Sequence, residues 1–518
     1  MNLSPPGLRS AGPLRWYEEI KNKEKILRKV DHFLDRFFRP RSVAIVGATN
    51  NHQKINYGLV GNLVNLNFQG TIYPVNPRGE KIQGLRTFAR LKDIPDKIDL
   101  VVIAVPATKA LDIVEECDTI GVKHVVIITG GFSEGGEQGK NLHMRIAAFA
   151  KERGVRIVGP NTLSPINTSN NLSISFSAIK TMKPGRVSFA FQSGLYDPKI
   201  NWLFSSMGIS KILDLGNKMD VNEVDALEYF LQDPDTEIIA MHIESVRGNG
   251  KDFFDLLKKG SLKKPTIILK SGRTPAGSLA AASHTGAIAS ENDVIFDSIM
   301  KQTAAIRAQN MEEFFDLAKA FAFLDVPKGN NLAIITLSGG EGVLATDICE
   351  TSSLRMAQLS DNTYQRLKRI FPPWEIPLNP IDVGVCLEFH LSDIVKVFDG
   401  LKAIPEDEHV DCVVMQLPPD LLGRDSENED LSTETPDLLK EEYTQAYVNI
   451  KRIGKPFALW RTSMDQVEDE WVEIFESHSL PVFQSSERAI NTLSALYEYS
   501  THRMRETGSS VETHDTKG

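Results

Sequence analysis

The chain has 518 residues, of which 41% are hydrophobic and 24% charged, so its composition is that of a soluble globular protein with several domains. Its formal net charge of −10 gives no electrostatic reason to expect nucleic acid or an anionic membrane as a partner. No apolar run approaches the roughly 18 residues of a membrane span, and no secretory signal is found. Four scattered cysteines without CxxC spacing favour reduced thiols, and together these features predict a cytoplasmic protein.

The first predicted element is a charged helix at 16–38, which we expect to be a surface helix or a partner contact. From residue 41 onward, short β-branched runs alternate with amphipathic segments, a pattern typical of a doubly wound parallel α/β domain. We therefore predict a helical extension at 1–36 and a Rossmann-like domain at 37–183. Its strands are expected at 42–46, 71–75, 100–105, 124–128 and 155–158.

Candidate ligand residues follow the strands of this first domain, where an open α/β sheet binds its ligands. Gly47-Ala48-Thr49 form a strand–turn–helix junction that favours a phosphate, although the full GxGxxG pattern is absent. The second strand is followed by Asn76 and Arg78 and lacks the acidic residue that would hold the ribose of NAD. Arg78 lies instead where the phosphorylated ribose of coenzyme A or NADP would lie, and Val105-Pro106 follow a later strand.

A second set of strands, near 186–191, 211–215, 237–244 and 265–270, predicts a flavodoxin-like domain at 184–327. Ser193-Gly194 follow the first of these strands and open a helix, which favours an anion, although an ordinary N-cap serine gives the same pattern. Glu244 ends the third strand, where it either orients a partner side chain or is simply solvated.

The fourth strand of this domain leads into a stretch of small residues around a single imidazole, His284. Imidazole is a competent nucleophile near neutral pH, so His284 is a candidate for a covalent intermediate. The alternative is a hydrogen-bonded histidine in a Gly/Ala-rich turn.

A third set of strands, near 331–337, 381–385, 410–416 and 456–461, predicts a second flavodoxin-like domain at 328–502. The polar stretch at 503–518 is expected to be a disordered tail. The sequence contains no P-loop and no metal-ligand spacing, so we expect neither an ATP site nor a metal site built by this chain.

Five motifs occur in a fixed order along the chain, and the ordered set is specific although each motif alone is weak. Together they resemble the α subunit of the NDP-forming acyl-CoA synthetases, the ADP-forming acetate–CoA ligase group related to succinyl-CoA synthetase. The resemblance runs from about residue 37 to about residue 499. The motifs are Tyr73-Pro74-Val75-Asn76-Pro77, Gly159-Pro160-Asn161, Gln192-Ser193-Gly194, Gly216-Asn217-Lys218 and Ser283-His284-Thr285-Gly286-Ala287.

The resemblance implies that acyl-CoA, ADP and phosphate are interconverted with a carboxylic acid, CoA and ATP through an acyl phosphate and a phosphohistidine. It implies that His284 is phosphorylated and that Glu244 orients it. Ser193, Gly194 and Gly286 would bind phosphate, and the loops around Gly47 and Arg78 would bind CoA. The ADP/ATP site and its Mg²⁺ would belong to a separate ATP-grasp β subunit, in an α2β2 assembly.

The sequence also departs from the pattern of that family. Relatives usually have small residues after Gln-Ser-Gly, where this chain has Leu195-Tyr196-Asp197-Pro198-Lys199. We therefore predict a short acid other than plain acetate, polar or charged, with Asn161, Tyr196 and Lys199 as contacts. Two alternatives remain: a non-catalytic CoA-binding regulatory subunit in which the altered Ser193 helix accepts no phosphate, and a Rossmann-type oxidoreductase, which the missing acidic residue disfavours.

Overall fold

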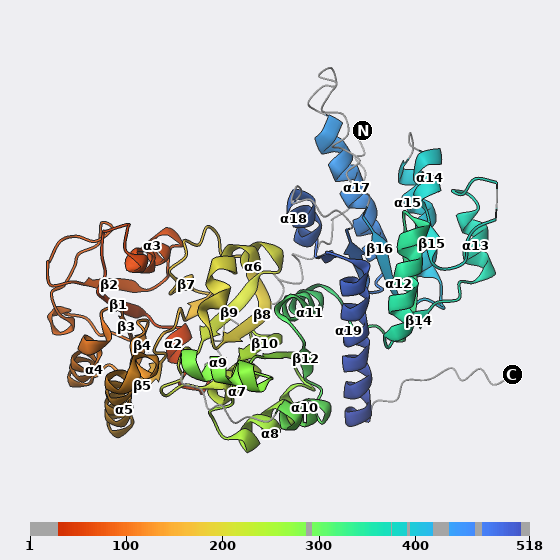
Figure 1. Ribbon diagram of the computed structural model, residues 1–518. Coiled ribbons are helices and arrows are strands. Elements are labelled where there is room, and N and C mark those ends of the chain that lie inside the picture. Colours follow the sequence, from red (N-terminus) through yellow and green to blue (C-terminus); the bar gives the residue numbers. More distant parts are fainter. Residues whose placement is uncertain are drawn as a thin grey trace, which may run out of the picture.

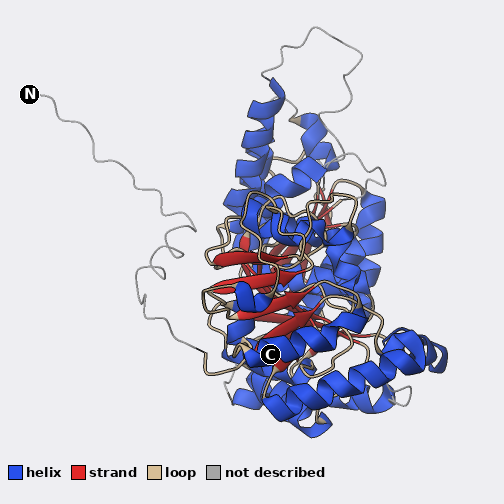
Figure 2. Ribbon diagram, turned by 90° about the vertical axis from the view of Figure 1, so that its left-hand side faces the viewer, coloured by secondary structure: helices blue, strands red, loops and turns tan. Residues whose placement is uncertain are grey.

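The computed structural model describes residues 30–285, 293–373, 375–390, 394–417, 435–461 and 469–508. Within these ranges three mostly parallel sheets follow one another along the molecule (Figure 1). Helices cover the strands of the sheets, as the side view shows (Figure 2). The predicted α/β class, with a Rossmann-like sheet followed by flavodoxin-like ones, is confirmed.

The first sheet has the order β2-β1-β3-β4-β5, and all its strands are parallel. The order reverses between β1 and β3, and in doubly wound sheets ligands bind at such a switch point. The strands are β1 (Ser42–Val46), β2 (Thr71–Val75), β3 (Leu100–Ile103), β4 (His124–Ile127) and β5 (Arg156–Val158), and the helices are α3 (Gly58–Asn65), α4 (Ala110–Thr119) and α5 (Gly136–Arg153).

The second sheet has the order β12-β11-β10-β8-β9-β6-β7 and is parallel except for β6 and β7. Its central strands are buried along their whole length, as expected of parallel strands covered on both faces. The strands are β6 (Ile166–Asn167), β7 (Leu172–Ser173), β8 (Pro184–Phe191), β9 (Ile209–Asp214), β10 (Ile238–Ile243), β11 (Thr266–Lys270) and β12 (Ile306–Ala308). The helices are α6 (Ile200–Ser206), α7 (Glu223–Gln232), α8 (Gly250–Gly260), α9 (Pro275–Thr285), α10 (Asp293–Lys301) and α11 (Met311–Phe323).

The third sheet has the order β14-β13-β16-β17-β18, with β15 paired to β13. Its strands are β13 (Asn331–Thr336), β14 (Arg355–Met356), β15 (Ile381–Asp382), β16 (Cys412–Gln416), β17 (Phe457–Trp460) and β18 (Val482–Phe483). The helices are α12 (Gly339–Thr351), α13 (Asp361–Leu367), α14 (Gly384–Phe389), α15 (Ile394–Leu401), α16 (Ala403–Glu406), α17 (Thr435–Lys451), α18 (Asp469–Ser477) and α19 (Ser486–Thr507).

The structure differs from the predicted domain limits at two places. Strands β6 and β7 precede residue 184 yet pair into the second sheet, because the edge of β9 accepts β6 in antiparallel register. Helix α19 continues to Thr507, beyond the predicted start of the tail at 503. The residues after 508 lie outside the described part of the chain.

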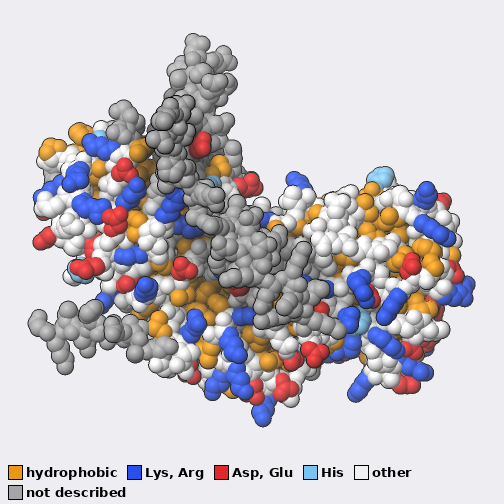
Figure 3. Space-filling view, turned by 180° about the vertical axis from the view of Figure 1, so that it is seen from behind, with side chains coloured by type: hydrophobic (Ala, Val, Ile, Leu, Met, Phe, Trp, Pro, Cys, Tyr) orange, Lys and Arg blue, Asp and Glu red, His pale blue; other side chains and the backbone are white. Residues whose placement is uncertain are grey.

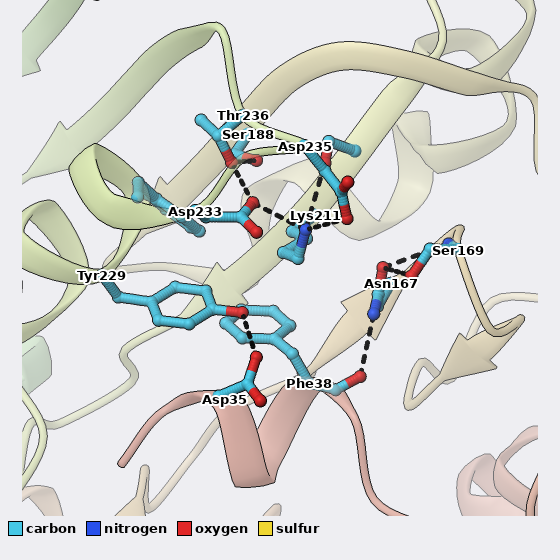
Figure 4. Close-up of polar contacts among 12 residues, drawn as sticks. Asp35, Phe38, Asn167, Ser169, Ser188, Lys211, Tyr229, Asp233, Asp235 and Thr236 are labelled. Carbon is cyan, nitrogen blue, oxygen red and sulfur yellow. Dashed lines mark hydrogen bonds and ion pairs between the residues drawn. The ribbon is translucent and has the colours of Figure 1, made fainter. Parts of the chain in front are cut away.

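The N-terminal segment is fixed to the second sheet by buried polar contacts (Figure 4). Of the helix predicted at 16–38, residues up to 29 lie outside the described part, and its end forms α2 (Asp35–Phe38). The carbonyl oxygen of Phe38 accepts a hydrogen bond from Asn167 Nδ2 at 2.9 Å, and Tyr229 Oη donates to Asp35 Oδ1 at 3.3 Å. Phe37 and Phe38 are fully buried, so this end of the predicted surface helix belongs to the core.

A buried ion pair lies beside this anchor. The Lys211 ammonium is 2.6 Å from Asp233 Oδ2 and 3.2 Å from Asp235 Oδ2, and the side chains of Lys211 and Asp233 are fully buried (Figure 4). Removing one partner of a buried pair leaves an uncompensated charge, so the pair fixes how β9 and the end of α7 meet.

The described surface carries charges of both signs, interspersed on the face shown in Figure 3. No helix in the described part of the chain is long and apolar enough to cross a membrane. All four cysteines are buried and unpaired, and burial raises the pKa of each thiol, to about 12 for Cys349 and Cys386. These thiols are therefore protonated and unreactive near neutral pH.

Candidate functional site

A cavity of about 590 Å³ lies at the carboxyl ends of the strands of the second sheet, bounded also by residues that follow β4 and β5. Its lining comes from the loops after β4, β5, β7, β8, β10 and β11, from the last residue of β9, and from α9. The cavity brings together four residues that the sequence predicted separately: Asn161, Ser193, Gly194 and Glu244. Parallel strands end at the same edge of a sheet, which explains why residues far apart in the chain meet there.

Glu244 is held at this cavity through Gln192 and a buried lysine. Gln192 Oε1 accepts hydrogen bonds from the backbone N–H of Glu244 at 2.8 Å and from Lys218 Nζ at 2.9 Å. Lys218 Nζ also lies 2.9 Å from Glu223 Oε2 and 2.6 Å from the Ser245 carbonyl oxygen. The side chains of Lys218 and Glu223 are buried, so this pair fixes the turn after β10 that carries Glu244.

A second carboxyl group, Asp214, lines the cavity at the end of β9. Its two oxygens accept backbone hydrogen bonds from Leu163 at 2.9 Å and from Gly216 at 3.0 Å. Burial is the largest influence on this carboxyl group and raises its pKa to about 7, against the lowering effect of those two hydrogen bonds. The cavity therefore contains a carboxyl group that changes charge near neutral pH.

Helix α9 forms the remaining wall through Gly277, Ala280 and Ala281. His284 is in the last turn of this helix, and its side chain lies outside the described part of the structure, as does the whole of Gly286. The small residues that the sequence places before His284 therefore line the cavity.

The predicted phosphate contacts Ser193 and Gly194 line the cavity, whereas two of the predicted acid contacts lie elsewhere. Ser193 precedes a 3₁₀ helix, Gly194–Lys199, that runs into α6, and its side chain makes no capping hydrogen bond. Tyr196 is fully buried, stacks on Phe191 and donates its hydroxyl to the Leu163 carbonyl oxygen. Lys199 is exposed and lies over the Phe315 ring at 5.7 Å. Neither Tyr196 nor Lys199 lines the cavity, so the geometry does not favour them as contacts of the acid.

The predicted CoA residues meet at the switch point of the first sheet. Asn76 Nδ2 donates to the Ala48 carbonyl oxygen at 2.9 Å, and Asn76 Oδ1 accepts from the backbone N–H of Arg78 at 3.0 Å. Gly47 has a φ of +93°, and a Cβ there would lie 2.6 Å from the Ala104 carbonyl oxygen and 2.8 Å from Val105 Cγ1. The loops after β1, β2 and β3 therefore pack at one edge, with Arg78 and Pro106 exposed.

A polar contact joins this edge to the cavity. The 3₁₀ turn Ser133–Gly135 carries Glu134, whose Oε1 accepts from the backbone N–H of Gly131 at 2.7 Å and whose Oε2 accepts from Asn217 Nδ2 at 2.6 Å. Asn217 precedes Lys218, so the loop that fixes Glu244 also contacts the first sheet.

No cluster of three or more His, Cys, Asp or Glu side chains able to hold a metal ion occurs among the described residues.

Two family descriptions match the chain. Residues 41–167 match the CoA binding domain, and residues 184–321 match the succinyl-CoA ligase like flavodoxin domain. The two matched domains follow each other in the order in which the first and second sheets occur.

Comparison with known relatives identifies the family of the chain. The α subunit of ADP-forming acetate–CoA ligase I from Pyrococcus furiosus is 34% identical over 90% of this chain and 98% of its own length. A solved dinucleotide-forming acetyl-coenzyme A synthetase 1 from Ca. Korarchaeum cryptofilum, in complex with phosphate and ADP, superposes with a TM-score of 0.78 at 31% identity, covering 92% of this chain and 99% of that one. The chain belongs to the family of ADP-forming acyl-CoA synthetases, as its motifs predicted.

Other relatives are longer. The ADP-forming 4-hydroxybutyrate–CoA ligase of Nitrosopumilus maritimus is 34% identical over 66% of this chain, which spans 49% of that protein. The chain likewise spans 49% to 67% of the length of several matching acetate–CoA ligases.

Sequence reasoning missed three residues that line the cavity: Asp214, Thr162 and Ser271. Asp214 and Ser271 each stand at the carboxyl end of a predicted strand, so the rule that found Glu244 could have found them too. Lys218 belongs to one of the five motifs, but nothing in the sequence indicated that its side chain is buried and supports the cavity wall.

Proposed function

We propose that the chain is the α subunit of an ADP-forming acyl-CoA synthetase and interconverts acyl-CoA, ADP and phosphate with carboxylic acid, CoA and ATP. The observation that carries the proposal is the single cavity that collects Asn161, Ser193, Gly194 and Glu244 beside α9. His284 follows Ala280 and Ala281 by four and three residues in α9, and both of these alanines line the cavity.

The proposed chemistry has three steps. A phosphate oxygen attacks the thioester carbonyl carbon, the C–S bond breaks, and CoA leaves as a thiolate that takes up a proton. An imidazole nitrogen of His284 then attacks the phosphorus atom of the acyl phosphate, and the P–O bond to the acyl group breaks to release the acid. The phosphohistidine finally gives its phosphoryl group to a terminal oxygen of ADP, which forms ATP and restores the imidazole.

The chain's own residues would position these groups. Ser193 and Gly194 present a hydroxyl and backbone N–H groups to a phosphoryl oxygen, and Gly286 follows the histidine. Glu244 would favour the charged imidazolium, because an opposite charge nearby stabilises the protonated ring. CoA would bind at Gly47-Ala48-Thr49, Asn76, Arg78 and Val105-Pro106, where a glycine with positive φ keeps the strand-end loops close together.

We propose an ATP-grasp subunit as the partner, in an α2β2 assembly, since relatives that match much of this chain are α subunits of ADP-forming acetate–CoA ligases. Mg²⁺ would enter with the nucleotide on that partner. The acid would be short and other than plain acetate. Leu163 and Phe176 line the cavity and are candidates for contacting its hydrocarbon part, with Asn161 as the polar contact.

A panel of acyl-CoA thioesters tests the proposal, with ATP formation from ADP and phosphate as the readout in the presence of the partner subunit. Wild type should form ATP, His284→Ala should form none, and Glu244→Gln should lose about 100-fold or more. CoA binding without ATP formation from any thioester would instead indicate a non-catalytic CoA-binding regulatory subunit. The highest kcat/KM with acetyl-CoA would contradict the proposed acid.

A further inference from the structure

The buried imidazole of His242 has no role in the chemistry proposed above. It lies in β10 on the same strand face as Ile238 and Ala240, and the residue is 2% exposed. Its Nε2 is 2.7 Å from the hydroxyl oxygen of Ser271. Its Nδ1 has no hydrogen-bond partner among the described residues. A buried histidine with one partner at the wall of a cavity calls for an explanation.

The proton on this ring can be assigned from its neighbours. Burial lowers the pKa of His242 to about 4, so the ring is neutral near pH 7 and has one N–H and one lone pair. If Nδ1 carried the proton, a buried N–H would lack an acceptor. If Nε2 carries it, that N–H donates to Ser271 Oγ, and only a lone pair on Nδ1 stays unpaired. Orphaned buried N–H groups are rarer than under-satisfied acceptors, so the hydrogen-bond network assigns the proton to Nε2.

This assignment determines what Ser271 can do. A serine hydroxyl has one proton to donate, and here its oxygen already accepts the N–H of His242. No acceptor for the Ser271 proton occurs among the described residues. Ser271 lines the cavity beside Gly272. The hydroxyl is therefore free to donate a hydrogen bond to a molecule bound there.

The surroundings favour an anion as that molecule. The Lys270 ammonium is 3.3 Å from the carbonyl oxygens of both Glu244 and Ser271, which puts a positive charge behind this wall. Glu244 and Asp214 line the same cavity and oppose a bound anion, whereas a hydrogen bond that a hydroxyl donates to that anion is charge-assisted and stabilises it.

We propose that Ser271 contacts the substrate: its hydroxyl, oriented by Nε2–H of the buried His242, donates a hydrogen bond to an anionic oxygen of the group bound in the cavity. The proposal rests on the proposed function, which supplies two such groups, the phosphate and the carboxylate of the acid. His242 acts through Ser271 and is a positioning residue.

The test measures ATP formation by the complex of this chain with its partner subunit, and the reverse reaction from acid, CoA and ATP. Ser271→Ala removes the donor and should raise KM for one anion about 10- to 100-fold, because a hydrogen bond to a charged group is lost. Ser271→Thr keeps the hydroxyl and should stay within a few fold of wild type. Ser261→Ala is the matched control, since among the described residues that buried hydroxyl bonds only the Leu257 carbonyl oxygen of the preceding helix α8.

Two variants test the role of His242. His242→Phe removes the N–H and should give part of the Ser271→Ala effect on the same KM. His242→Gln keeps a donor near the Nε2 position and should recover most of the loss. An ¹⁵N spectrum of the imidazole in the chain alone should show Nε2 protonated and Nδ1 not, and this readout needs no activity.

The outcomes distinguish phosphate from the carboxylate of the acid as the acceptor of the hydrogen bond. They also distinguish failure of this inference from failure of the proposed function. A raised KM for inorganic phosphate identifies a phosphoryl oxygen as the acceptor, and a raised KM for the acid identifies its carboxylate. Unchanged constants in an active Ser271→Ala enzyme, or a protonated Nδ1, overturn the inference and leave the proposed function standing. If wild type forms no ATP from any thioester, both proposals fail together.

Discussion

Lys218 supports the wall of the cavity through several hydrogen bonds of its ammonium group. Its ammonium binds Glu223, Gln192 and Ser245, and it lies 3% exposed in a turn that also contacts the first sheet through Asn217. Lys218→Met leaves the Glu223 carboxylate buried without its counter-charge. The free energy of unfolding should fall by about 3–5 kcal/mol, measured by urea denaturation.

The double variant Lys218→Met, Glu223→Gln is the control for that prediction. Removing both charges should recover part of the loss, because the remaining carboxamide can still accept the backbone N–H of Gly248. A double variant as unstable as the single one would show that the buried charge is not the cause.

His242 predicts a pH dependence of stability. Its pKa is about 4 in the folded chain against about 6.5 unfolded, so the unfolded chain binds the extra proton first as the pH falls. Its contribution is fully present above about pH 6.5, and about 3 kcal/mol is lost progressively as the pH falls toward 4. The free energy of unfolding of His242→Phe should therefore fall less steeply than that of wild type over this range. Parallel curves for wild type and His242→Phe would contradict the lowered pKa of His242.

The loop after β1 owes its shape to Gly47. Gly47 has a φ of +93°, and a Cβ at this position would have no space beside Ala104 and Val105. An alanine there must therefore push the loops after β1 and β3 apart. Gly47→Ala should weaken CoA binding at least 10-fold by isothermal titration calorimetry. Gly121→Ala is the control, since Gly121 also has a positive φ, of +79°, but open space around it. Equal affinities in the two variants would count against this CoA site.

Elements that consist of long apolar runs could be predicted from the sequence. The buried runs of β1, β8, β10 and β13 each lie within a residue or two of the predicted limits, because burial on both faces demands continuous hydrophobicity. Apart from β5 and β15, the two- and three-residue strands were not predicted: β6, β7, β12, β14 and β18. They are too short to carry a period, and their pairing depends on the neighbouring strand edge.

Some features of the cavity could likewise be predicted from the sequence, and others could not. Strand-end residues such as Ser193 and Glu244 could be placed in advance, because topology alone brings them to one edge. The burial of Tyr196 could not be predicted, because a tyrosine in the first turn of a helix can equally lie on the surface. Its stacking on Phe191 becomes visible only once β8 and the following helix are packed.

The second and third sheets share one hydrophobic core. A single cluster of buried residues runs from Ile238 of β10 through Phe314 of α11 to Leu493 of α19. Figure 1 shows α19 standing between the two sheets. Arg488 of α19 clamps Asp316 of α11 with two bonds of 2.5 and 2.8 Å. The two sheets therefore form one unit.

Calorimetry tests whether the second and third sheets unfold together. The two sheets should unfold in one transition, because separating them would expose the shared core. Arg488→Met leaves the buried Asp316 carboxylate unpaired and should lower the stability by on the order of 3 kcal/mol without splitting that transition. Separate transitions for the two sheets in the wild-type chain would contradict a common core.

The measurement that tests the central claim most directly is labelling of this chain by [γ-³²P]ATP in the presence of the partner subunit. The label should be acid-labile and base-stable, should map to His284, and should disappear when CoA and the acid are added. His284→Ala should take up none, and Glu244→Gln should take up label far more slowly. An unlabelled wild-type chain that still binds CoA would contradict the account and leave a CoA-binding subunit without phosphoryl chemistry.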